Sequence, residues 1–229
     1  EGQERQKLSL TYRALRRFNR SLMSVWFREL DIVDNENIPQ QGGIMFVSWH
    51  PSGLIDPMLL HASLPGKLSI LAKHTLFDIP IIGRMIRSGG GLPIYRAKDS
   101  ENIDVAKHKN RYMLENAGIE ISQGGRLLLF PEGRTHTESN VSKAKTGAAR
   151  IMLTALRHSQ INGLPEPTLI PVGLHYSNSN KFRERGAVIL ERGMNLPDIP
   201  PLHSSEHEQT KAGCCSYLAR EVQAQKLHR

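Results

Sequence analysis

The sequence GGIMFVSWHPSGLID, residues 42–56, joins a short apolar run to a polar turn. The apolar run, residues 43–49, has the length and composition of a buried strand. Pro57 follows the turn at a position that suits the start of a helix. This spacing predicts a strand that crosses over directly into a helix.

The rest of the chain repeats this alternation of short apolar runs and helical patterns. The runs predict further strands at residues 68–73, 91–96, 127–131, 169–175 and 187–191, and helices are predicted at residues 56–64, 99–117 and 146–158. Alternating strands and helices are typical of an α/β sheet. We expect a single α/β domain, with a mixed, mostly parallel sheet flanked by helices. Residues 195–207 predict a loop, which leads to a final helix at about residues 208–228.

A basic amphipathic helix is predicted before this domain. Apolar residues recur at steps of three and four from Leu8 to Leu30, and arginines lie between them. The apolar stripe could pack on the domain's own core, or it could lie in a bilayer interface with the arginines toward anionic headgroups. We assign residues 1–35 to this segment, a candidate membrane-surface anchor, and residues 36–229 to the domain.

Charge and composition narrow the function classes. The 229 residues carry 30 Lys and Arg against 22 Asp and Glu, a formal net charge of +8. Such a balance suits nucleic acid, phosphorylated metabolites or an acidic membrane face. Aromatic residues make up only 6% and the sequence contains no zinc-finger or RNP-like pattern, so we do not expect nucleic acid as a partner. The sequence has no apolar run long enough to predict a membrane-spanning helix.

His50 and Asp56 lie at the two ends of the turn after the first of these strands. The turn can bring the Asp56 carboxylate to one imidazole nitrogen, which leaves the other nitrogen to take a proton from a hydroxyl. The simpler alternative is structural, because an Asp before Pro is a common helix cap. On this pair alone, the structural interpretation is favoured.

The run GGGLPIYR, residues 89–96, is a glycine turn and a short strand that end in Arg96. A guanidinium at this place can bind a phosphate with two hydrogen bonds, although an exposed charge at a strand end is the simpler explanation. The glycines do not continue into a dinucleotide-binding or Walker pattern. Nucleotide binding is therefore not predicted.

In the run FPEGRT, residues 130–135, an apolar strand stops at a proline and is followed by Glu132, Gly133 and Arg134. Ligands of open α/β sheets bind at the carboxyl ends of the strands, so this cluster is expected to face the same crevice as His50. A turn alone does not require Glu-Gly-Arg. For this run, a role in ligand binding is therefore favoured over a purely structural turn.

Taken together, the runs resemble the motifs of the glycerophospholipid acyltransferase family, which includes the glycerol-3-phosphate and lysophosphatidate acyltransferases. The first block is WHPSGLID, the second GGLPIYR, the third FPEGRT and the fourth LIPVGLHY, and KAKTGAARIML resembles the basic helix after the third block. The likeness spans roughly residues 50–176. Five residues separate His50 from Asp56, where the commonest family form has four, and a longer variant with Pro after Asp also occurs in the family.

The resemblance implies transfer of a fatty acyl group from acyl-CoA or acyl carrier protein to glycerol-3-phosphate or its monoacyl ester, in phospholipid biosynthesis. It implies His50 as general base and Asp56 as its orienting partner, without a metal or other cofactor. The residues implied to hold the acceptor phosphate are Arg96, Glu132, Gly133, Arg134 and Lys145, and Gly91 and Pro171 are motif residues of acyl-binding or structural type. It also implies a peripheral protein at the cytoplasmic face of a membrane. Acceptor, donor type, chain length and positional selectivity stay open.

Rival interpretations are weaker. Ser52 lies close to His50 but lacks the G-x-S-x-G elbow of a serine hydrolase. Adjacent Cys214 and Cys215 lack the spacing of metal ligands, so no metal site is expected. His61, His74 and His175 are predicted to be ordinary histidines of helices or strands. A different class is a non-catalytic phosphate- or lipid-binding module on the same fold.

Overall fold

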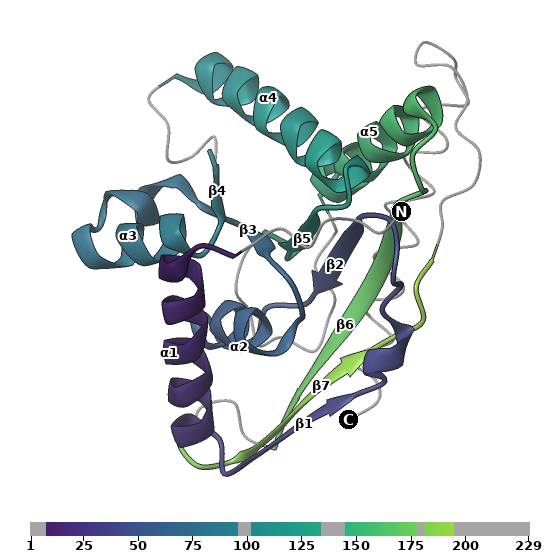
Figure 1. Cartoon of the computed structure of the whole chain (residues 1–229). Helices are drawn as coiled ribbons and strands as arrows, with labels where there is room; N and C mark the ends of the chain where they lie inside the picture. Colours follow the sequence, from purple (N-terminus) through teal and green to yellow (C-terminus); the bar gives the residue numbers. More distant parts are fainter. Residues whose placement is uncertain (1–7, 96–101, 134–144, 178–180, 195–229) are drawn as a thin grey trace.

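The structure is a computed structural model that describes residues 8–95, 102–133, 145–177 and 181–194. Within these residues, one seven-stranded sheet has the order β1-β7-β6-β2-β5-β3-β4 (Figure 1). The strands are β1 (Glu29–Val33), β2 (Ile44–Ser48), β3 (Leu68–Lys73), β4 (Gly91–Ile94), β5 (Arg126–Leu129), β6 (Thr168–Tyr176) and β7 (Arg185–Leu190). The strands β6, β2, β5, β3 and β4 are mutually parallel, and β7 pairs antiparallel with β6. The predicted mixed, mostly parallel α/β sheet is confirmed.

Helices cover both faces of this sheet (Figure 1). They are α1 (Leu10–Trp26), α2 (Ile55–Ser63), α3 (Pro80–Ser88), α4 (Ile103–Ser122) and α5 (Gly147–Asn162), with short 3-10 turns η1 (Asn35–Asn37) and η2 (His74–Asp78). Side chains of β2 alternate between the faces: Phe46 packs in the core that α1 and α2 cover, and Met45 in the core under α4 and α5. Two apolar cores therefore hold β2 at the centre of the molecule.

The predicted N-terminal helix is confirmed, but it is shorter than predicted. The helix ends at Trp26, because Phe27 is already extended, and residues 29–33 form β1, which pairs in parallel with β7. The predicted anchor segment of residues 1–35 thus contributes an edge strand to the sheet. Leu30 fits the spacing of a helix but belongs to this strand.

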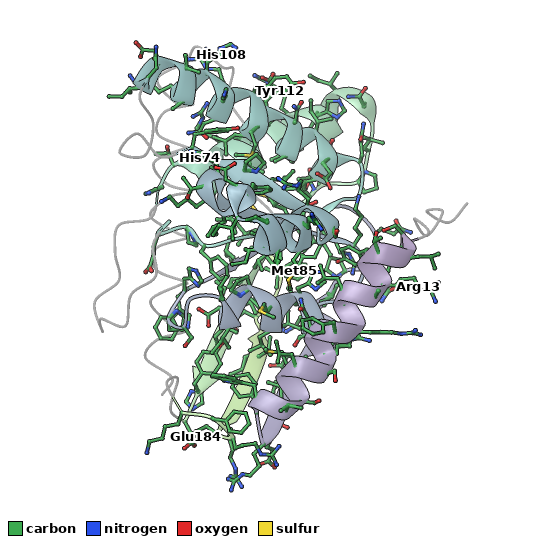
Figure 2. All side chains as sticks on the ribbon, turned by 90° about the vertical axis from the view of Figure 1, so that its left-hand side faces the viewer. Arg13, His74, Met85, His108, Tyr112 and Glu184 are labelled. Atoms are coloured by element: carbon green, nitrogen blue, oxygen red, sulfur yellow. The ribbon has the colours of Figure 1, made fainter. Side chains whose placement is uncertain are left out.

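Both faces of α1 carry apolar side chains. Met23 is buried with Phe27 in the core beneath α2, whereas Phe18 and Val25 are 54% and 53% exposed on the outer side. Figure 2 shows Arg13 of α1 pointing away from the molecule. Within the described residues, no helix is both long and apolar enough to cross a bilayer.

Two arginines of α1 bind the end of α2. The Arg16 guanidinium donates to the carbonyls of Leu64 and Gly66, and Arg20 Nε donates to the carbonyl of Ala62 at 3.0 Å. The last carbonyls of a helix lack partners within the helix, so these cations satisfy them and also offset the negative end of the helix dipole. This part of the basic face therefore docks α1 on the domain.

Parallel strands bring their carboxyl ends to one edge of the sheet. β2 leads into His50 and β5 into Phe130, and the two strands are neighbours. Val172 of β6 pairs with Ser48 at the end of β2, and β6 continues for four more residues to Tyr176. The end of β6 therefore lies beside the loop that follows β2. The predicted loop at residues 195–207 and helix at 208–228 lie outside the described residues.

Candidate functional site

The loop between β2 and α2 forms the pair that the spacing predicted. It turns through Gly53, whose φ of +59° lies in the left-handed region that favours glycine, and α2 then begins so that Asp56 lies in its first turn. His50 Nδ1 donates to Asp56 Oδ2 at 2.8 Å, and the backbone N–H of Ser52 donates to the same oxygen at 2.7 Å. Because an ionised carboxylate only accepts, Nδ1 carries the proton and Nε2 of the neutral ring is the free acceptor.

The second oxygen of Asp56 also has a partner. The Tyr176 hydroxyl, at the end of β6, donates to Asp56 Oδ1 at 2.8 Å. Asp56 is 0% exposed, so its charge depends on these donors for stabilisation. Burial, and after it the negative charge of Asp56, raise the pKa of Tyr176, so its phenol stays protonated and donates.

The plane of the His50 ring is fixed from one side. Phe130, directly after β5, stacks on the imidazole with ring centroids 4.1 Å apart and an angle of 15° between the planes. The His50 side chain keeps 18% of its surface exposed. The ring is thus held by Asp56 at one edge and by Phe130 on one face, and it is still reachable from outside.

His50 lines a cavity of about 1160 Å³. The apolar lining comes from both helices and strands, and Leu15 of α1, Met58 of α2, and Ile82 and Met85 of α3 are among its residues. Figure 2 shows Met85 near the middle of the face that carries α1 and α3. Large apolar cavities with a few convergent polar groups are typical of ligand sites. The lining fits a long apolar ligand whose reactive end lies at His50.

The cluster after β5 contributes polar lining to the same cavity. Glu132 is buried, and both Glu132 and Lys145 line the cavity together with His50. Gly133 has a φ of +65°, and a Cβ there would lie 2.7 Å from Lys145 Nζ. The lysine side chain therefore passes directly over this glycine. Lys73, at the end of β3, is a further cavity residue that the motifs did not single out.

The remaining predicted residues fall into two groups. Gly91 starts β4, where a Cβ would lie 2.1 Å from Ile86 Cγ2, so glycine lets α3 pack closely on this strand. Pro171 lies within β6 and pairs with Val47 of β2. Gly91 and Pro171 are therefore both part of the sheet. Arg96 and Arg134 lie outside the described residues.

The two rival interpretations were a serine nucleophile at Ser52 and a metal site. Ser52 Oγ is buried without a hydrogen-bond partner among the described residues, so it forms no Ser–His pair with His50 there. The part of the chain that the structure describes contains no group of three or more His, Cys, Asp or Glu side chains that could hold a metal ion. Cys214 and Cys215 are not among those residues.

Comparison with known proteins gives the family. A family model described as Acyltransferase matches residues 29–175, which is more than half of the chain. The chain belongs to the acyltransferase family. The family resemblance that the motifs predicted is confirmed, and the matched range contains His50, Asp56, Glu132 and Lys145.

The fold of this acyltransferase is also found in a solved structure. It is similar to the crystal structure of PlsC from Thermotoga maritima, a 1-acyl-sn-glycerophosphate (LPA) acyltransferase, with a TM-score of 0.60 and 18% sequence identity. The similarity covers 93% of this acyltransferase and 79% of the other chain. A search of curated proteins gave no match.

Sequence reasoning missed Tyr176 and Phe130 as parts of the site of this acyltransferase. Both residues lie inside the motifs, Phe130 at the start of FPEGRT and Tyr176 at the end of LIPVGLHY. The available signal was their position directly after or at the end of a predicted strand. An aromatic residue there is more often core than site, so the signal was weak.

Proposed function

We propose that this protein is an O-acyltransferase that moves a fatty acyl group from acyl-CoA or acyl carrier protein to a hydroxyl of glycerol-3-phosphate or 1-acylglycerol-3-phosphate. One observation supports this above the others: the ring of His50, oriented by the buried Asp56 carboxylate, opens on a large apolar cavity. PlsC, the protein of similar fold, is a 1-acyl-sn-glycerophosphate acyltransferase, and the compound in that name is one of these two acceptors. The reaction belongs to phospholipid biosynthesis.

The proposed reaction needs one base. His50 Nε2 takes the proton of the acceptor hydroxyl while that oxygen attacks the thioester carbonyl carbon of the donor. The new C–O bond forms, the C–S bond breaks, and the imidazolium returns the proton to the leaving thiolate. Asp56 holds the imidazole in the required tautomer and stabilises the imidazolium between these two transfers. General base catalysis of this kind typically contributes about 10²–10⁴-fold to the rate.

The acceptor phosphate is proposed to bind at the polar side of the cavity. Lys145 and Lys73 supply cations there, and Glu132 can bind a glycerol hydroxyl or orient a neighbouring cation. The motif arginines Arg96 and Arg134, with Gly133, complete the proposed set. Binding both substrates in one site lowers the entropic part of the barrier. Metals and other cofactors have no part in the scheme.

The donor chain and the product are lipids, so we propose that the protein works at a membrane surface, on the cytoplasmic face. The outer side of α1 supports this, because exposed Phe18, Leu22 and Val25 lie along it with the exposed Arg13 and Arg17. Such a side suits insertion between anionic headgroups. The net charge of +8 suits the acidic donors and the phosphorylated acceptor as well.

The test is acyl transfer by the purified full chain. A radiolabelled acyl thioester is incubated with glycerol-3-phosphate, lysophosphatidate or lysophosphatidylcholine, and the lipid products are separated. His50→Ala should reduce the rate by about 10²-fold or more while the unfolding temperature stays near that of the wild type. The matched control, His108→Ala, removes an exposed histidine of α4 and should keep the wild-type rate.

Equal rates for His50→Ala and the wild type would exclude His50 as the base. If the wild type binds acyl donor or acceptor but transfers no acyl group to any of the three acceptors, the non-catalytic binding module becomes the better interpretation.

A further inference from the structure

The Asp56 carboxylate accepts hydrogen bonds from three donors, which come from two parts of the chain. Oδ2 accepts from His50 and from the Ser52 backbone, both in the loop after β2, and Oδ1 accepts from the Tyr176 hydroxyl at the end of β6. A carboxylate with a donor on each oxygen cannot rotate about its bond to Cβ without losing a charge-assisted hydrogen bond. Its plane, and with it the direction in which Oδ2 faces the imidazole, is therefore fixed.

Tyr176 is itself held in place. Its ring stacks on Phe27, with centroids 5.6 Å apart and an angle of 9° between the planes, and the side chain is buried in the core that α1 and α2 cover. Phe27 lies at the junction of α1 and β1 and is also buried. The residues that match the family end at position 175, one residue before Tyr176.

We propose that Tyr176 is a positioning residue for acyl transfer, which fixes the Asp56 carboxylate so that Oδ2 holds the His50 ring in its reactive orientation. This inference rests on the proposed role of His50 as general base. Tyr176 does not act on the substrate itself. It acts through Asp56, and its effect must therefore appear in the behaviour of the His50–Asp56 pair.

Removal of the hydroxyl has a defined electrostatic consequence. The Tyr176 O–H stabilises the His50–Asp56 pair most when the imidazole is neutral and the carboxylate is ionised, because the pair then has a net negative charge. When the pair gains a proton, its net charge becomes zero, whichever of the two side chains holds that proton. The Tyr176 hydroxyl then stabilises the pair less. Without the hydroxyl, the pair holds its proton more tightly, so the pKa of the pair rises.

Other titratable groups near the pair do not bond to this carboxylate in the part of the chain that the structure describes. Besides His50, the titratable side chains that line the cavity are His61 from α2, Lys73 from β3, Tyr95 after β4, and Glu132 and Lys145 from the segment after β5. They are unchanged in a Tyr176→Phe variant, which also keeps the ring that stacks on Phe27. The variant therefore isolates the hydroxyl.

The experiment measures the pair in two ways on the full chain. Histidine-labelled protein is titrated by NMR, with the His50 signals assigned from His50→Ala, and kcat and KM are measured against pH for acyl transfer. For Tyr176→Phe we expect the His50 titration midpoint and the acid limb of kcat/KM to move to higher pH by about one unit, or ~1.4 kcal/mol. We expect kcat at neutral pH to fall about tenfold with little change in the KM of the acyl donor.

The matched control is Tyr12→Phe. The Tyr12 hydroxyl is also buried and accepts from the Leu68 N–H at 2.8 Å, but it contacts neither member of the pair. This variant should lose a similar amount of stability and leave the His50 midpoint in place. A Tyr176→Phe variant that folds and titrates like the wild type would overturn the inference. If the wild type transfers no acyl group but the His50 midpoint still shifts in Tyr176→Phe, the proposed function is wrong. The effect of Tyr176 on the His50–Asp56 pair is then still supported.

Discussion

His61 of α2 is a buried histidine whose ionisation opposes folding. It is 2% exposed, and its Nδ1 accepts from the Asn19 side-chain amide of α1 at 3.1 Å. Burial lowers the pKa of His61 from 6.5 to about 4, and the positive charges of Arg16 and Arg20 add to this effect. The neutral ring is therefore part of the contact between α1 and α2.

The depressed pKa of His61 predicts a loss of stability in acid. Because the unfolded chain binds this proton at 6.5 and the folded chain only near 4, His61 destabilises the fold progressively as the pH falls through that window. The free energy of unfolding should drop by about 2 kcal/mol from this group between pH 7 and pH 5. Urea unfolding at both pH values measures it. His61→Gln, which does not titrate, should have a smaller drop by this amount, and an unchanged drop would contradict the assignment; His108→Gln serves as the exposed control.

The site residues differ in how far the sequence could predict them. His50 and Asp56 are six positions apart in one turn, so local spacing was enough to predict their contact. Tyr176 and Asp56 are 120 positions apart, and they meet because β6 lies beside β2 and extends beyond it. Strand order is a property of the whole sheet. No local pattern in the sequence encodes the strand order, so the contact between Tyr176 of β6 and Asp56 could not be predicted from the sequence.

At the scale of elements, burial decided which predictions succeeded. Strands such as β2 and β6 are buried on both faces and leave continuous apolar runs, which the sequence shows directly. β1 is an edge strand with mostly exposed side chains, so it has no such run, and its Leu30 extended the apparent helical spacing. α3 was also missed. It is a short helix, residues 80–88, and its apolar residues line the cavity rather than a continuous core.

The arginines of α1 should divide into two functional groups. Arg13 and Arg17 are exposed, whereas Arg16 and Arg20 bind carbonyls at the end of α2. Arg13→Glu with Arg17→Glu should weaken binding to vesicles of anionic phospholipid, by about 1 kcal/mol or more for each residue, with little change in unfolding temperature. Arg16→Ala should instead lower the free energy of unfolding by about 1–3 kcal/mol, because the partly buried carbonyls of Leu64 and Gly66 lose their charged donor. Vesicle flotation and thermal unfolding of both variants measure this division. Equal flotation of the Arg13/Arg17 variant and the wild type would remove the membrane role of this side.

On the scale of the whole molecule, the N-terminal segment connects the proposed membrane-facing side to the reactive pair. α1 exposes Phe18 outward and buries Met23 inward, Phe27 stacks on Tyr176, and Tyr176 binds Asp56. β1 then adds the edge strand beside β7. A detachable anchor would make few contacts of this kind. We therefore predict that residues 1–35 fold together with residues 36–229.

A chain that lacks residues 1–35 tests this integration. The deletion removes the side chains of Met23 and Phe27 from the core, and large buried side chains of this kind typically contribute about 2–5 kcal/mol each to the free energy of unfolding. It also exposes the edge of β7. Such a loss is comparable with the whole stability of an ordinary domain. We therefore expect the truncated chain to be insoluble or to unfold far below the full chain, as followed by circular dichroism during heating. The full-length Arg13→Glu, Arg17→Glu variant is the matched control, since it changes the outer side and keeps every core contact. A truncated chain as stable as the full one, and defective only in vesicle binding, would make residues 1–35 a separate anchor after all.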